Sequence, residues 1–207
     1  MKISLTNYVR IHSIITAILN NEDARIDKAC LYYASFGAFI LSEKLGIDAR
    51  MVTGVAAYHL GDNGNILTFG ERDGDLVKAS KTGFHAWVVA DGWLIDFMAP
   101  IFGTAEFMPD KNTSFEAKML QKPISDMKDD ISSISTQGDF FLLPDGPLTM
   151  EHYSFMHSKP MIGDLAEICC KWFVKAPGNI PPSIGIGNKQ GDVNFISYEP
   201  VKLNGVW

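Results

Sequence analysis

Cys30 lies where the sequence predicts the start of a buried helix. The stretch from Lys28 to Leu45 is apolar at most positions, which is typical of a helix covered on nearly every side. Asp27 is a good candidate for the N-cap of this helix, and Gly46 for the residue that ends it. Cys30 would then be the third helical residue, where unpaired N–H groups and the helix dipole favour negative charge. This position could make the thiol a nucleophile and its N–H an oxyanion donor; the alternative is a small, buried packing residue.

His85 and Asp96 lie on two apolar segments that the sequence predicts to form a hairpin. Asp-Gly at 91–92 is typical of a two-residue type I′ turn, which would place Ala90 opposite Trp93. His85 and Asp96 would then point to the same face of the hairpin as diagonal neighbours. A carboxylate that orients an imidazole is the usual partner of an active nucleophile. The alternative is a buried structural His–Asp pair with no catalytic role.

Three segments around these residues resemble a known family. Residues 46–55 (GIDARMVTGV) resemble the Gly-Ile-Pro-Ala-Arg segment of transglutaminase-like proteins, residues 84–88 (FHAWV) resemble their His-Ala-Trp strand, and residues 93–96 (WLID) resemble their Trp-x-x-Asp strand. These proteins belong to the papain-like cysteine enzymes, in which a cysteine-bearing helix packs on an antiparallel β-sheet.

The resemblance covers residues 27–100 and implies both a fold and a set of roles. It implies an α+β, papain-like core in which Cys30 is the nucleophile, His85 the general base and acid, and Asp96 the orienting carboxylate. Candidates for a second oxyanion donor are Tyr8, Asn20 and Asn21.

Hydropathy patterns predict the elements that position these residues within a single domain, 1–207. Residues 27–100 form the catalytic core of this prediction, and residues 101–207 add helices, loops and one edge strand. The expected helices are 3–19, 28–45, one exposed helix within 107–137, and one that a capping box opens at 164–167. The expected strands are 49–60, 66–69, 84–90, 93–98 and 193–198, with a surface loop at 70–82.

Composition excludes several classes of protein. The chain has 207 residues, of which 46% are hydrophobic, and its formal net charge is −6. The apolar fraction is too high for a disordered chain, and the acidic balance argues against nucleic-acid binding. Three cysteines do not make a disulfide framework, and no segment has the pattern of a membrane span or targeting signal. We therefore expect a cytoplasmic protein without a membrane or nucleic-acid partner.

These expectations converge on a cysteine-dependent acyl-transfer enzyme that needs no metal or organic cofactor. Its substrate would be a peptide or a small amide or ester, and hydrolysis of amide or peptide bonds is the favoured reaction. Two alternatives stay open: an acyl transferase like the transglutaminases or arylamine N-acetyltransferases, and a non-catalytic binding module with the same fold. Loops 61–82 and 102–136 would shape the cleft, and they contain no basic cluster for coenzyme A.

Other candidate residues carry weaker predictions. Tyr58, His59 and Trp87 are candidates for substrate binding because they lie on strands near the expected site. Cys169 and Cys170 are adjacent on an expected helix, where core packing is the safer interpretation. A metal site at His152 and His157 lacks support from neighbouring carboxylates or cysteines.

Overall fold

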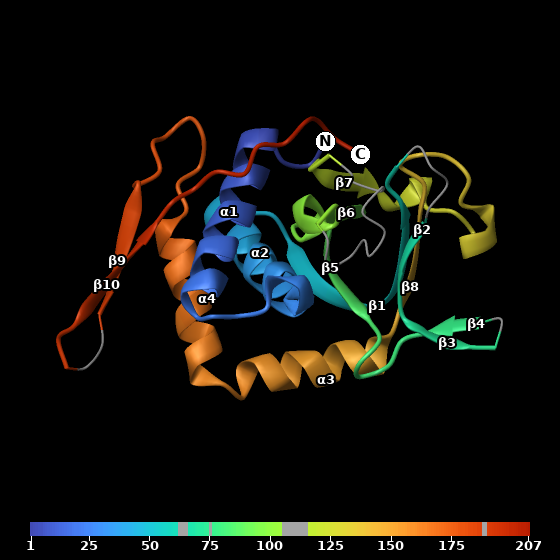
Figure 1. Ribbon diagram of the computed structural model, residues 1–207, viewed down its shortest axis with the longest axis horizontal. Helices are drawn as coiled ribbons and strands as arrows, with labels where there is room; N and C mark the ends of the chain where they lie inside the picture. Colours follow the sequence, from blue (N-terminus) through green and yellow to red (C-terminus); the bar gives the residue numbers. More distant parts are fainter. Residues whose placement is uncertain (62–65, 75, 105–115, 188–189) are drawn as a thin grey trace.

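The computed structural model describes residues 1–61, 66–74, 76–104, 116–187 and 190–207 (Figure 1). Within these ranges a curled, six-stranded antiparallel sheet has the order β2-β1-β5-β6-β7, with β8 also paired to β1. The strands of this sheet are β1 (Ala49–His59), β2 (Ile66–Phe69), β5 (His85–Ala90), β6 (Trp93–Asp96), β7 (Leu120–Pro123) and β8 (Phe140–Pro144). The fold class is therefore α+β, as predicted.

The long strand β1 organises the sheet. Its first half pairs with β5, from Ala49 opposite Ala90 to Gly54 opposite His85. Its second half pairs with both β2 and β8, so β1 has a strand on each side there. Because Gly54 is paired with both His85 and Pro144, β5 and β8 lie on opposite sides of β1. His85 consequently begins β5 close to the end of β2.

Four α-helices pack against this sheet or against one another in the described ranges. They are α1 (Leu5–Asn21), α2 (Cys30–Leu45), α3 (Gly146–His157) and α4 (Pro160–Trp172). Helix α2 contacts β1 and β5 on one side and α1 and α4 on the others, which explains why it is apolar almost all round. Helix α3 runs along β1, and α4 stands beside α2 (Figure 1). No helix in the described part of the chain is long and apolar enough to span a membrane.

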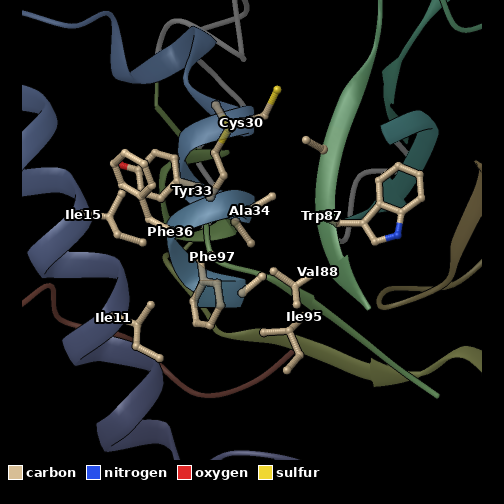
Figure 2. Close-up of a cluster of buried hydrophobic side chains, with 14 of the residues drawn as sticks. Ile11, Ile15, Cys30, Tyr33, Ala34, Phe36, Trp87, Val88, Ile95 and Phe97 are labelled. Carbon is tan, nitrogen blue, oxygen red and sulfur yellow. The ribbon is translucent and has the colours of Figure 1, made fainter. Parts of the chain in front are cut away.

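Close packing fixes α2 on the sheet. Figure 2 shows Val88 and Phe97 pointing toward α2, whereas Trp87 points away from it on the other side of β5. A Cβ atom on Gly37 would lie only 2.3 Å from Cδ2 of Phe97. Glycine at this position therefore allows the helix to approach the segment that follows Asp96.

Most of the expected strands and both N-terminal helices are confirmed, with shifts of a few residues at their ends. Gly46 ends α2 in the left-handed conformation, with φ 64°, as expected. The turn at 91–92 has φ 47° and 77°, and Ala90 pairs with Trp93, so the predicted type I′ register is also confirmed.

Two predictions about local structure are wrong, one helix was not predicted, and one prediction is tested only in part. Residues 70–82 contain a small hairpin, β3 (Glu71–Asp73) with β4 (Leu76–Lys78), rather than only a loop. Helix α4 begins at Pro160, so the capping box at 164–167 lies inside it. Helix α3 was not expected. The exposed helix within 107–137 is absent from residues 116–137, which form β7 and the short 3-10 turns Ile124–Asp126 and Ile131–Ser133, while 107–115 lie outside the described residues.

The expected edge strand near the C-terminus exists but belongs to a separate hairpin. Strand β10 (Val193–Ser197) pairs with β9 (Ser183–Gly187) and with no strand of the main sheet in the described ranges. Figure 1 shows this hairpin projecting beyond α4, on the far side of the molecule from β2.

Candidate active site

Cys30 is the first residue of α2, two positions closer to the helix start than predicted. A 3-10 turn (Ile26–Lys28) precedes the helix, and Ala29 is its N-cap. Asp27 is therefore not the N-cap; its carboxylate instead pairs with Arg25 at 2.5 Å. As the first helical residue, Cys30 has no intrahelical acceptor for its N–H, and the positive end of the helix dipole lies beside its side chain. The prediction that Cys30 lies at a helix start is confirmed, but the N-cap is Ala29 and not Asp27.

His85 and Asp96 form the buried pair that the hairpin register predicts. Both side chains are almost completely buried, at 0% and 1% exposure, and Nε2 of His85 lies 2.7 Å from Oδ2 of Asp96. Nδ1 on the other side of the ring has no nitrogen or oxygen partner among the described residues. The bond to Asp96 fixes the ring orientation and leaves Nδ1 as the nitrogen available for proton transfer.

Asp96 is held by three further groups. The Tyr58 hydroxyl donates a hydrogen bond of 3.1 Å to the same oxygen that His85 contacts. The N–H of Met98 donates to Oδ1 at 3.0 Å, and the hydroxyl of Tyr8 donates to the backbone carbonyl of Asp96. A buried carboxylate with several donors is well satisfied as an anion.

The charges of this cluster shift the pKa of His85 upward. Burial lowers the pKa of the ring, but the Asp96 carboxylate and, to a smaller degree, the Cys30 thiol raise it to about 9. Cys30 and His85 both line the same cavity. The raised pKa favours the imidazolium form, and a positive ring in one cavity with a cysteine at a helix start is the setting in which a thiol acts as a nucleophile.

Aromatic rings enclose the imidazole. The ring of Phe69 stacks on His85 at 4.2 Å between centroids, and Phe102 contacts it edge-on at 5.6 Å. These rings restrict the motion of His85 and exclude water from the His85–Asp96 bond. Burial of Tyr58 and its nearness to Asp96 both raise the pKa of the Tyr58 hydroxyl well above its usual value, so this group stays a donor to the carboxylate.

A cavity of about 470 Å³ contains both Cys30 and His85 in its wall. The rest of the described lining comes from the turn before α2, from β2, from the segment leading into β5, and from the end of β6: Asp27, Lys28, Leu67, Thr68, Phe69, Thr82, Phe84 and Met98. Four of these residues belong to the segment 61–82 that was expected to shape the cleft. The volume is within the range of small-molecule binding sites.

Tyr58, His59 and Trp87 are all buried and are not part of the cavity wall. Tyr58 lies behind the pair, bonded to Asp96. The Nδ1 atom of His59 and the Nε1 atom of Trp87 have no hydrogen-bond partner in the part of the chain that the structure describes. Contact of these three residues with substrate stays a prediction.

Two of the three candidates for a second oxyanion donor form hydrogen bonds to other groups, and none of the three lines the cavity. Tyr8 is fully buried and bonds the backbone of Asp96. The Asn21 side chain is half-buried and bonds Glu22 and Asn194. The cavity wall includes neither residue, nor Asn20.

Sequence reasoning missed Phe69, Phe102, Tyr8 and Met98 as neighbours of the pair. Each contact joins elements that are distant in the chain or depends on a backbone group, so no local pattern reports it. The order of strands on β1 was needed to place Phe69 beside His85.

The other two cysteines are packed in α4, as expected. Burial raises the pKa of both thiols, most strongly at the fully buried Cys169. Neither His152 nor His157 belongs to a metal-binding group, because no cluster of three potential ligands occurs among the described residues.

Comparison with known proteins gives a family but no activity. Residues 4–207 match the model of a family described as "Protein of unknown function (DUF2026)". A solved structure described as "The crystal structure of genomics APC5867" is similar over 100% of this chain and 98% of that chain, with 34% sequence identity and a TM-score of 0.89. No curated protein matches. With nearly all of its length matched, the chain belongs to this family of proteins of unknown function (DUF2026).

Proposed function

We propose that this protein is a cysteine-dependent acyl-transfer enzyme, and that its reaction is hydrolysis of an amide or peptide bond. The observation that carries the proposal is the position of His85. One ring nitrogen is bonded to the buried Asp96 carboxylate, and His85 shares the wall of one cavity with Cys30.

The chain order and the local motifs also support a papain-like, transglutaminase-like core. In this chain, as in the transglutaminase-like proteins, a cysteine begins a helix that packs on an antiparallel sheet. The sheet carries histidine and then aspartate on neighbouring strands. Under this proposal, Cys30 is the nucleophile, His85 the general acid and base, and Asp96 the carboxylate that holds the ring.

The reaction proceeds in two steps. Cys30 thiolate attacks the substrate carbonyl and forms a C–S bond, while its N–H at the helix start stabilises the oxyanion. The imidazolium of His85 gives its proton to the leaving amine as the C–N bond breaks, which leaves a thioester. His85, now neutral, takes a proton from water as the water oxygen attacks the thioester. The C–S bond then breaks, the carboxylic acid is released, and the thiolate–imidazolium pair is restored.

Hydrolysis is favoured over acetyl transfer from coenzyme A by the cavity wall. Among the residues described there, Lys28 is the single lysine or arginine, which is a poor match for a polyphosphate-bearing donor. Water is therefore the simplest acyl acceptor.

The proposal is tested by the reactivity of the three thiols. The folded protein is treated with limiting iodoacetamide at pH 6, and adducts are mapped by mass spectrometry. We expect Cys30 to react first, because Cys169 and Cys170 are buried thiols with raised pKa values. His85→Ala should slow alkylation of Cys30, whereas His157→Ala, at an exposed histidine outside the site, should not.

Equal reactivity of all three cysteines, or reaction of Cys30 only after unfolding, would show that Cys30 is a packing residue. If Cys30 is selectively reactive, thioester formation on candidate acyl donors is then sought by intact mass. Accumulation of an adduct that is absent in Cys30→Ser would identify the donor.

A further inference from the structure

A second cavity lies between α2, α3, α4 and the start of β1. Its volume is about 440 Å³, which is within the range of small-molecule binding sites. Among the described residues, it shares no lining residue with the cavity that contains Cys30. The part of α2 in its wall, residues 35–42, begins more than one helical turn beyond Cys30. The second cavity is therefore separate from the candidate active site.

Small side chains leave this space open. The wall includes Ala38 and Ser42 from α2, Gly163 and Ala166 from α4, and Ala49 from the start of β1. Helical residues three or four positions apart lie on the same face, so α2 and α4 each present small residues to the cavity. A Cβ atom added at Gly163 would meet no atom within 4 Å. Larger side chains at these positions would fill the space.

Hydrogen bonds hold the α3 side of the cavity in place. The Tyr153 hydroxyl accepts a bond of 3.0 Å from the N–H of Met51 and donates one of 3.2 Å to its carbonyl. One turn earlier in α3, the hydroxyl of Thr149 accepts from the N–H of Thr53 at 3.0 Å. Helix α3 cannot move onto α2 without breaking these bonds to β1. The cavity is therefore formed before any ligand enters, which lowers the cost of binding.

The inner wall is apolar and extends along two helices. Its larger side chains are Phe36, Phe39, Met51, Met156 and Ile162. Residues 35–42 of α2 and 160–167 of α4 each cover about two helical turns, or roughly 10 Å. An apolar space of this length favours an alkyl chain over a compact polar molecule.

The charge of the wall differs between its two ends. Lys159 lies at the end where α4 begins, and Glu167 lies about two turns further along the same helix. The Glu167 carboxylate pairs with Lys171 at 3.0 Å, which balances its charge. A positive charge remains at the Lys159 end, so an anionic group is favoured there.

We propose that this cavity binds an alkyl monocarboxylate of medium length, such as octanoate or decanoate. Its chain lies between α2 and α4, and its carboxylate contacts Lys159. The apolar wall supplies most of the affinity, and each methylene group that enters the cavity increases affinity about fourfold. The exposed ammonium group of Lys159 fixes the direction of the chain and adds a factor of about five or less.

Calorimetric titration of the full chain with hexanoate, octanoate and decanoate, below their micelle concentrations, tests this inference. We expect the Kd to fall roughly fifteenfold for each pair of added methylene groups. Lys159→Gln should weaken binding of octanoate by up to about fivefold and leave binding of octanol unchanged. Lys175→Gln, which removes an exposed lysine outside the cavity wall, is the control and should change neither affinity.

Substitutions in the wall test the location of the ligand. Gly163→Leu and Ala166→Leu place larger side chains in the cavity and should abolish binding of decanoate. Gly163→Ala adds one carbon where no atom lies within 4 Å, and should keep most of the affinity. Thermal unfolding of each variant without ligand shows that the variants compared are folded.

Three results would overturn the inference. The first is the absence of saturable binding of decanoate to the native protein. The second is an equal effect of Lys159→Gln on octanoate and octanol, which would show that the site does not select an anion. The third is unaltered binding in folded Gly163→Leu or Ala166→Leu, which would place the ligand elsewhere. None of these measurements depends on Cys30, so they leave the proposed function to its own test.

Discussion

At the scale of single residues, the site depends on how His85 is held. Its ring is bonded to Asp96 on one side, stacked on Phe69, and left without a hydrogen bond at Nδ1. A buried polar atom without a partner costs free energy. At the wall of a cavity beside a thiol, this cost is consistent with a nitrogen kept available for proton transfer.

The raised pKa of His85 is expected to depend on the charge of Asp96. Burial alone lowers the pKa of the ring, and Asp96 is the main group that raises it to about 9. In Asp96→Asn the carboxylate charge is lost while burial remains, so the pKa of His85 should fall well below 9. NMR titration of the His85 ring measures this change, and an unaltered midpoint would contradict the assigned cause.

Tyr58 is expected to act as a positioning residue through Asp96. Tyr58→Phe removes one donor to the carboxylate oxygen that also contacts His85, which should raise the pKa of His85 and destabilise the fold by about 1 to 3 kcal/mol. The control is Tyr33→Phe, which removes a buried hydroxyl bonded to Thr16 at 2.7 Å. Both variants should lower thermal stability, but only Tyr58→Phe should move the His85 titration. If the pKa of His85 were the same in Tyr58→Phe and Tyr33→Phe, Tyr58 would have a purely structural role.

At the scale of elements, the site is assembled where β1 changes partners. Gly54 is the position at which β5 gives way to β2 on one side and β8 begins on the other. Its Cβ would lie 2.1 Å from the backbone oxygen of Leu143 and 2.9 Å from Cα of Pro144. Backbone atoms cannot move aside as a flexible side chain can, so this junction requires glycine.

Gly54→Ala should therefore destabilise the protein by about 1 to 3 kcal/mol or more and should slow alkylation of Cys30 by displacing His85. The matched control is Gly163→Ala in α4, where an added Cβ meets nothing within 4 Å. That change should be neutral or stabilising by up to about 1 kcal/mol. Denaturant unfolding of the two variants measures the difference, and equal stability would contradict the assigned contact.

The same elements show what the sequence could predict. The His85–Asp96 register follows from a two-residue turn, because the turn type fixes which residues face each other. The start of α3 does not follow from the sequence, because Pro-Asp-Gly-Pro at 144–147 is also typical of the end of a segment. In the structure Asp145 is an N-cap whose side chain accepts from Leu148 N–H, and proline stands in the first turn. Aspartate and proline are common both at the end of a strand and in the first turn of a helix, and tertiary packing decides which of the two structures forms.

The positions of β2 and β8 on β1 were beyond local patterns for a different reason. Strands 66–69 and 140–144 pair with the same stretch of β1 from opposite sides, although they are more than seventy residues apart in sequence. Periodicity identifies strands but not their order in a sheet. The stack of Phe69 on His85 depends on that order.

At the scale of the whole molecule, two buried histidines give the stability opposite dependences on pH. His12 in α1 is fully buried, bonds the carbonyl of Phe97 through Nδ1 at 2.7 Å, and stacks on Tyr33. Burial lowers its pKa to about 4, despite the bond to Phe97, which raises it. His85 is shifted the other way, to about 9. Both residues flank the segment after β6, so both titrations are linked to global unfolding.

The two shifts act over different ranges. The unfolded pKa of histidine is about 6.5. Because the folded pKa of His12 is lower, its contribution to stability is complete above about pH 6.5 and is lost as pH falls toward 4. Because the folded pKa of His85 is higher, its contribution is complete below about pH 6.5 and is lost as pH rises through 9. Together the two residues favour maximum stability near neutral pH.

The acid range is tested by His12→Gln. In the native protein, protonation of His12 should cost about 3 kcal/mol between pH 6.5 and 4, since each pKa unit corresponds to about 1.4 kcal/mol. The variant is destabilised at pH 7 because it loses packing, but its free energy of unfolding should fall less steeply over this range. His157→Gln, at an exposed histidine, is the control and should follow the native slope. Urea unfolding at half-unit intervals gives both slopes, and parallel curves for native protein and His12→Gln would show that His12 does not couple acid to unfolding.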